Sequence, residues 1–99
     1  MTVEEIKDGE KLQLKINGRI DTVTIQQFQD TLLKAFQRSK TLILDFTGVD
    51  YVSSAGLRAL ILGQKTAESK GGSMVLIHVN DGVKDIFRVT GFNKVLTVQ

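Results

Sequence analysis

Two adjacent serines, Ser53 and Ser54, lie in the stretch YVSSAGLRALIL at residues 51–62, where an apolar strand pattern gives way to an apolar helix pattern. We call this expected strand-to-helix junction the serine corner. The hydroxyl of Ser53 or Ser54 can cap the helix, because a serine oxygen accepts a hydrogen bond from the free N–H groups of the first turn. A hydroxyl at such a corner can also be exposed and modified. If Ser54 is the cap, Ser54→Ala should cost about 1 kcal/mol of stability. The residue types alone leave both roles open.

A serine hydrolase is the enzyme class that these residues could serve, with Ser54 as nucleophile and His78, the only histidine, as base. Such a mechanism needs the nucleophile, the base and an orienting acid close together, and His78 lies near the end of an apolar run, where packed histidines are common. The chain contains no cysteine, which excludes a disulfide framework, a cysteine metal site and a thiol nucleophile. Its glycines form no dinucleotide or Walker-type motif. We therefore expect a protein that is not an enzyme and has no cofactor or metal.

Three aspartates, Asp21, Asp45 and Asp50, each follow or end an apolar strand pattern. Loops after parallel strands gather at one edge of a sheet, so these carboxylates can share an edge. Turn chemistry and solubility account for Asp45 and Asp50. For Asp21, which follows the segment NGRI, we expect a position beside the Ser54 corner.

Length and composition fit one globular domain over residues 1–99, with 41% hydrophobic and 24% charged residues. The net charge is only +2, and the lysines and arginines are spread along the chain with few aromatic residues, which argues against a nucleic-acid surface. The N-terminus has no signal-peptide pattern, and no apolar run approaches the roughly 18 residues of a membrane helix. We expect a cytoplasmic protein that does not insert into membranes.

Four segments of the chain predict strands that follow a leading strand around Val3 and Ile6. Strict alternation over about residues 11–17 is typical of a strand with one solvated face, and Asp8-Gly9 before it is a hairpin turn signal. Short apolar runs indicate buried strands. We expect them at residues 41–46, 73–79 and 94–98, with the segment TGVDY as a polar interruption after the first.

Three segments show the helical spacing of apolar residues. The first covers about residues 24–38, the second follows the serine corner and ends at Gly71-Gly72, and the third begins at Asn80 or Asp81 and stops at Gly91. Strands alternating with helices predict an α/β fold: a mixed, mostly parallel sheet after an antiparallel hairpin, with helices mainly on one face. The side chains expected to face the core are Ile25, Phe28, Leu32, Ala35 and Phe36 in the first helix, Leu57, Leu60, Ile61 and Gln64 in the second, and Val83, Ile86, Phe87 and Thr90 in the third.

Four blocks of the sequence, LILDFTGVDYVSSAGLRALI, NGRID, KGGSMVLIHV and VKDIFRVTGFNKVL, resemble the successive blocks of a free-standing STAS domain and together cover essentially the whole chain. This resemblance implies successive βα turns and an anti-sigma factor antagonist. It further implies that the unphosphorylated protein binds an anti-sigma factor that is a GHKL-type serine kinase. Phosphorylation by the kinase would end the binding, and a PP2C-type phosphatase would restore it.

The family pattern at the corner often has the form D-S-S-G-L, with the first serine phosphorylated. Alignment through Gly56 and Leu57 places Ser53 at the family's aspartate, Ser54 at the phosphoacceptor and Ala55 at the following serine. The change from Asp to Ser leaves two adjacent hydroxyls and removes a nearby negative charge. The resemblance thus implies phosphorylation at Ser54 and a partner-binding surface that consists of Asp21, Ser53, Ser54, Ala55, Gly56 and Leu57.

A phosphate on Ser54 would stand at a helix N-terminus, where the backbone N–H groups and the helix dipole favour an anion. It should therefore act at the interface with a partner and not by melting the helix. The alternative function within the same family is an accessory subunit of an ABC-type lipid transport complex or another assembly without a sigma factor. Family members often carry a further helix after the last strand, and for this sequence, whose last residue is Gln99, that helix is either absent or truncated.

Overall fold

The alternating N-terminal residues form a β-hairpin in the computed structural model, which describes residues 1–99. Strand β1 (Thr2–Asp8) pairs with β2 (Lys11–Ile20) in antiparallel register, and Gly9 between them has φ +62°. The turn therefore contains a left-handed backbone conformation that glycine adopts without steric cost. The hairpin predicted around Asp8-Gly9 is confirmed.

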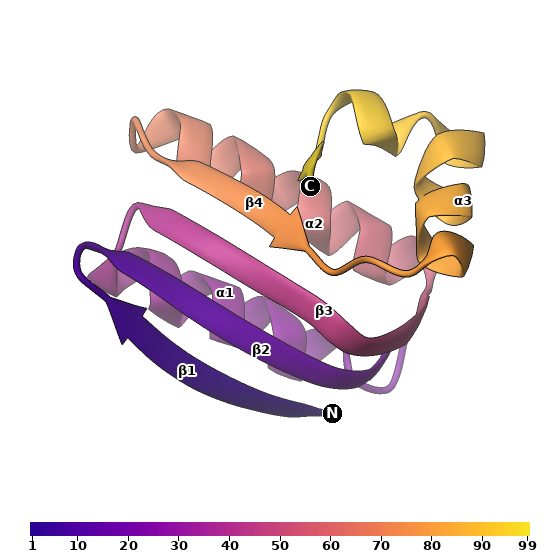
Figure 1. The fold of residues 1–99 in the computed structure, drawn as a ribbon, viewed down its shortest axis with the longest axis horizontal. Coiled ribbons are helices and arrows are strands. Elements are labelled where there is room, and N and C mark those ends of the chain that lie inside the picture. Colours follow the sequence, from indigo (N-terminus) through magenta and orange to yellow (C-terminus); the bar gives the residue numbers. More distant parts are fainter.

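The remaining elements alternate between helix and strand, as the sequence predicts, and the sheet has the order β1-β2-β3-β4-β5 with all pairs after the hairpin parallel. Figure 1 shows α1 and α2 behind the sheet and α3 beyond the end of β4. This confirms the α/β fold with a mostly parallel sheet. The elements after the hairpin are α1 (Ile25–Arg38), β3 (Thr41–Val52), α2 (Ser54–Ser69), β4 (Ser73–Ile77), α3 (Asp81–Thr90), the 3₁₀ turn η1 (Phe92–Lys94) and β5 (Thr97–Val98).

The core lies between the sheet and α1 and α2, because alternate residues of each strand point to the same face. Leu14 of β2 and Leu44 of β3 are fully buried on this face, while their neighbours Gln13 and Ile43 on the opposite face are only partly buried. Helical spacing places the largest apolar side chains of the helices against the strands. Buried helix residues include Phe28, Leu32, Ala35 and Phe36 in α1, Leu57 and Leu60 in α2, and Val83 and Phe87 in α3.

Strands β2 and β3 extend beyond their predicted ends, so the prediction of a polar interruption at TGVDY is wrong. The strands stay paired as far as Ile20 and Val52, with register shifts between Lys15 and Asn17 and between Gly18 and Arg19. Such irregularities let a pair of strands continue past residues that break the alternation. The extension carries the sheet to the serine corner.

Two further boundaries and one core residue differ from the sequence prediction. Strand β4 ends at Ile77 because His78 adopts a left-handed backbone conformation with φ +57°. Strand β5 is only Thr97–Val98, since residues 92–94 form the 3₁₀ turn. Thr90 is exposed and not in the core, and its hydroxyl donates a hydrogen bond to the carbonyl of Ile86 at 2.7 Å. These segments lie at element ends, where local hydrogen bonds replace the regular pattern.

Asn80 is the N-cap of α3, as one of the two predicted alternatives, and it also ties this helix to the sheet. Its Oδ1 accepts a hydrogen bond from the N–H of Val83 at 2.9 Å, and its Nδ2 donates to the carbonyl of Val49 at 2.8 Å. At the other end, the C-cap Gly91 has φ +79°, which confirms the predicted stop. One side chain thus fixes α3 against the extended part of β3.

Candidate functional site

Ser53 is the N-cap of α2, and it links the helix to the end of the sheet. Its Oγ accepts a hydrogen bond from the N–H of Gly56 at 3.2 Å, and its carbonyl accepts from the N–H of Leu57 at 2.9 Å. Its own N–H donates to the carbonyl of Ile20 at 2.8 Å. The half-buried Ser53 therefore performs the capping role that a serine at this corner was expected to take.

Ser54 is the first residue of α2, and its side chain has a different environment. It is exposed, and its hydroxyl makes no hydrogen bond within the chain, whereas that of Ser53 is engaged. The N–H groups of a first helical turn have no partner within their own helix, so an anion on this side chain would find donors nearby. The prediction that Ser54→Ala would remove a helix cap is wrong, because the N-cap of α2 is Ser53.

Gly56 allows the start of α2 to rest directly on the ends of two strands. A Cβ at this position would lie 2.8 Å from Cγ2 of Ile20, 2.9 Å from Cγ1 of Val52 and 3.1 Å from the carbonyl oxygen of Ile20. Gly56 and Leu57 are both buried. They position the corner, and its exposed surface is supplied by Ser54 and the half-buried Ala55.

Asp21 lies at the same corner, since it directly follows Ile20, whose carbonyl binds the N–H of Ser53. Its Oδ1 accepts hydrogen bonds from the N–H groups of Val23 at 3.0 Å and Thr24 at 3.2 Å. Burial raises the pKa of Asp21, but these bonds, with those from Arg19 and the Thr24 hydroxyl, outweigh it and hold the pKa below its ordinary value. The carboxylate thus stabilises the turn that leads into α1.

Arg19 and Tyr51 form a pair next to this corner that the sequence reasoning did not find. They are cross-strand partners, and the guanidinium carbon of Arg19 lies 4.4 Å from the centroid of the Tyr51 ring. Nε of Arg19 also lies 3.4 Å from Oδ2 of Asp21. Both side chains are exposed, and arginine and tyrosine are among the residue types that dominate protein interfaces. The only sequence signal is their spacing, each two residues before Asp21 or Ser53.

Asp45, Thr47 and His78 form a separate cluster on β3 and the end of β4. Asp45 is buried. Its Oδ1 accepts hydrogen bonds from the Thr47 hydroxyl at 2.6 Å and from the Thr47 N–H at 2.9 Å, and it lies 3.1 Å from Nδ1 of His78. Burial raises the pKa of Asp45, but the bonds from Thr47 and then His78 outweigh it and lower the pKa. No hydrogen bond joins His78 to Ser54, so the pair that a serine hydrolase requires is not assembled.

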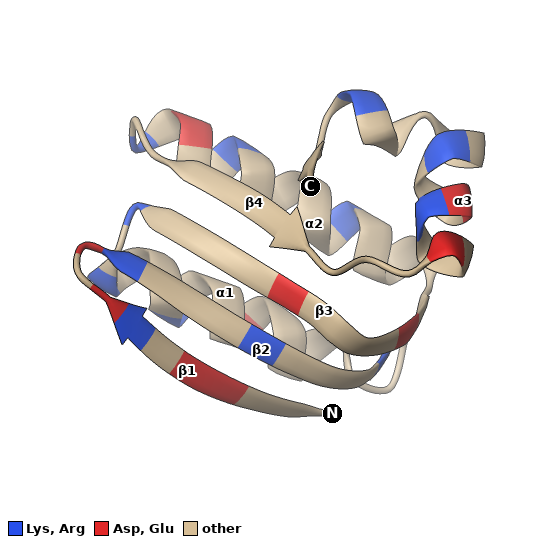
Figure 2. Ribbon diagram, viewed as in Figure 1, with Lys and Arg blue, Asp and Glu red and all other residues tan.

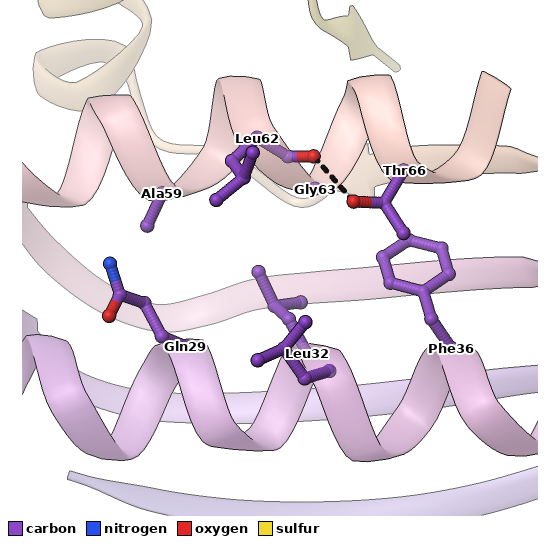
Figure 3. A pocket seen from close by; sticks show the side chains of 8 residues that line it. Gln29, Leu32, Phe36, Ala59, Leu62, Gly63 and Thr66 are labelled. Atoms are coloured by element: carbon purple, nitrogen blue, oxygen red, sulfur yellow. Dashed lines mark hydrogen bonds between the residues drawn. The ribbon is translucent and has the colours of Figure 1, made fainter. Parts of the chain in front are cut away.

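A small apolar cleft of about 130 Å³ lies between α1 and α2. Figure 3 shows Leu32 and Phe36 of α1 directed toward Leu62, Gly63 and Thr66 of α2, with the Thr66 hydroxyl bonded to the Leu62 carbonyl at 2.8 Å. Gly63 lets Met74 and Leu32 approach α2 closely, because a Cβ at this position would lie 3.0 Å from Sδ of Met74 and 3.3 Å from Cδ1 of Leu32. The full lining is Gln29, Leu32, Leu33, Phe36, Ala59, Leu62, Gly63 and Thr66.

Charged groups elsewhere give no second concentrated site. Lysines and arginines are intermixed with aspartates and glutamates over the strands and helices (Figure 2), and the side chain of Asp50 is exposed without an ion pair. No three acidic, histidine or cysteine side chains are grouped so that they could hold a metal ion. No helix of the structure is both long enough and apolar enough to cross a lipid bilayer.

The fold and the serine corner define a small α/β domain in which a strand ends at a hydroxyl-bearing residue that starts a helix. The chain belongs to the STAS family: the family model described as "Mlab, STAS domain" matches residues 3–98. The BtrV protein of Bordetella bronchiseptica, by its name a candidate anti-sigma factor antagonist, is 27% identical over 84 residues, which are 84% of this chain and 72% of that protein. The anti-sigma-B factor antagonist of Listeria monocytogenes is 23% identical over 95 residues, which are 94% and 82% of the two chains.

Solved structures show the same fold. The anti-sigma factor antagonist SpoIIAA in its unphosphorylated form superposes with a TM-score of 0.80 at 18% identity, over 99% of this chain and 88% of that one. The phosphorylated form of SpoIIAA from Bacillus has a TM-score of 0.74 at 17% identity, over 99% and 91% of the two chains. The chain is thus a member of a family of regulatory proteins that includes anti-sigma factor antagonists.

Proposed function

We propose that this protein is an anti-sigma factor antagonist whose binding is controlled by phosphorylation at Ser54. In its unmodified form it binds an anti-sigma factor that is a GHKL-type serine kinase. Phosphorylation by that kinase ends the complex, and a PP2C-type phosphatase restores it, in the cytoplasm. The proposal rests on the different environments of the two serines. Ser53 caps α2, while the Ser54 hydroxyl is exposed and makes no hydrogen bond within the chain.

The physical effect of the phosphate lies at the interface. It brings about −1.5 to −2 charges to the first residue of a helix, where the dipole and the free N–H groups favour an anion, so the helix stays intact. A partner that covers this corner must remove water from the dianion, and an apolar or acidic partner surface meets it unfavourably. The small side chains of Ser54 and Ala55 let a partner approach the unmodified corner closely.

The relatives support this proposal. SpoIIAA has been solved in both an unphosphorylated and a phosphorylated form, and both superpose on this chain. The protein from Listeria monocytogenes is named an antagonist of anti-sigma-B factor. An anti-sigma factor is therefore the class of partner that we infer for this chain.

The binding surface that we propose consists of Ser54 and Ala55, flanked by Asp21 and by Arg19 with Tyr51. Asp21 contributes by fixing the turn before α1 and by holding Arg19 at 3.4 Å. Ser53, Gly56 and Leu57 contribute through the position of the helix start, because they are wholly or half buried.

Phosphopeptide mass spectrometry after reaction with the cognate kinase and ATP tests the modification. Wild-type protein and Ser53→Ala should carry phosphate on Ser54, and Ser54→Ala should carry none. Phosphate on Ser53, with Ser54→Ala still modified, would show that the wrong serine has been assigned.

Pull-down from the native organism tests the partner. Ser54→Ala should retain a kinase of the GHKL type, and Ser54→Asp should retain less of it, although one carboxylate reproduces the phosphate's charge only in part. Recovery of a transporter ATPase and permease in place of the kinase would support the accessory-subunit function and contradict the sigma-factor function.

A further inference from the structure

Arg58 is the one arginine of the chain without a carboxylate partner. The other three, Arg19, Arg38 and Arg88, each form an ion pair, with Asp21, Glu5 and Asp85 respectively. Arg58 forms none, and no acidic residue lies in the first turn of its helix, α2. An exposed guanidinium at this place is therefore available to an anion that the unmodified chain does not supply.

The position of Arg58 relative to Ser54 is set by the buried side of α2. Leu57 and Ala59, on either side of Arg58, are buried against the core, so Arg58 faces solvent. Ser54 is exposed as well and lies four residues earlier, one turn of the helix away. Side chains at positions i and i+4 are neighbours on a helix surface. The Ser54 hydroxyl and the unpaired Arg58 guanidinium thus lie on the same exposed side of α2.

We propose that Arg58 binds the phosphate on Ser54 within the same helix, an inference that rests on the proposed function. An arginine binds phosphate oxygens through charge-assisted hydrogen bonds with a geometry that suits its planar fork. Arg58 is the suitable residue because Arg19, the arginine two residues before Asp21, is held by Asp21 and the Tyr51 ring. Phosphorylation then changes the binding surface twice: it adds an anion at Ser54 and withdraws the cation of Arg58 from a partner.

The test uses the full chain with phosphoserine installed at position 54 during synthesis, so that no kinase is needed. The second pKa of the phosphate, about 6 in an exposed phosphoserine, is followed by phosphorus NMR. Arg58→Gln should raise this pKa by about 0.3 units, which corresponds to an exposed i,i+4 ion pair. Lys65→Gln is the matched control: it removes one positive charge from the same helix, seven residues further along, and should leave the phosphate pKa unchanged. Arg58→Lys should restore part of the shift.

A second measurement keeps the inference testable without the phosphoprotein. In unmodified protein, the cycle of Ser54→Asp, Arg58→Gln and the double variant should show a coupling equal to about 2 °C in Tm, with the carboxylate and Arg58 stabilising each other. Equal phosphate pKa values in wild type and Arg58→Gln, an equal change in Lys65→Gln, or no coupling in the cycle would overturn the pairing. A kinase that fails to modify Ser54 would instead contradict the proposed function, and these measurements would still report on Arg58.

Discussion

The assignment of Ser53 as the cap of α2 can be tested sharply, because Ser53→Ala and Ser54→Ala make the same chemical change at neighbouring positions. Ser53→Ala removes the oxygen that accepts the hydrogen bond from Gly56 N–H at 3.2 Å. Gly56 is buried, so water does not readily replace that acceptor. Ser54→Ala removes an exposed hydroxyl that has no partner in the chain.

The expected magnitudes differ enough to be measured. Loss of an N-cap serine costs about 1 kcal/mol, with a range of roughly 0.5–2 kcal/mol, while an exposed substitution without partners changes stability by less than about 0.5 kcal/mol. In a domain of this size, 1 kcal/mol corresponds to a fall in Tm of about 4–8 °C. Ser53→Ala should therefore melt several degrees below wild type, and Ser54→Ala should melt close to it.

Circular dichroism at 222 nm is the suitable probe, since the chain has no tryptophan and three helices. Thermal and urea unfolding of the three proteins in the same buffer give the difference in unfolding free energy. Equal losses in the two variants, or a loss in Ser54→Ala alone, would refute the assignment of Ser53 as the cap.

Three further predictions concern Asp45, Gly56 and Arg19. The pKa of Asp45 is lowered in the folded protein, so its contribution to stability is present above the ordinary pKa of 3.8 and is lost as the pH falls through the folded value. Urea unfolding should therefore show Asp45→Asn less stable than wild type at pH 7, and this difference should shrink below pH 3.8. A difference that does not change with pH would contradict the hydrogen bonds from Thr47. Gly56→Val should lower the unfolding free energy by about 1–3 kcal/mol, because its Cβ would meet two strands at 2.8–3.1 Å, and unchanged urea unfolding would show that the contact is not tight. Arg19→Ala should reduce partner recovery in a pull-down with little change in Tm, and unchanged recovery would exclude the pair with Tyr51 from the interface.

The architecture followed from the sequence because periodicity reports which residues are buried. Alternation in β2 and helical spacing in α1 and α3 reflect one-sided contact with a core, and the capping residues Asn80 and Gly91 mark where backbone groups need other partners. Each of these signals is local, so it can be found without knowledge of the fold.

The ends of β2 and β3 could not be predicted in the same way. Residues such as Gly48 and Asp50 are typical of turns, yet each strand continues because its neighbour supplies hydrogen bonds across two register shifts. That pairing is a long-range interaction, which local sequence patterns do not encode. The contact of Arg19 with Tyr51 was missed for this reason, since it exists only where both strands continue.

Under the proposed function, the placement of the two hydroxyls would let a modification act without unfolding the domain. A phosphate on Ser53 would convert the oxygen that accepts the Gly56 N–H into a phosphate ester and would have to fit a half-buried position beside the Ile20 carbonyl. A phosphate on Ser54 leaves that bond intact and projects into solvent at the positive end of the helix dipole. Because the structural bond and the free hydroxyl belong to different residues, the surface charge of the corner can change by about two units while the core contacts of α2 stay the same.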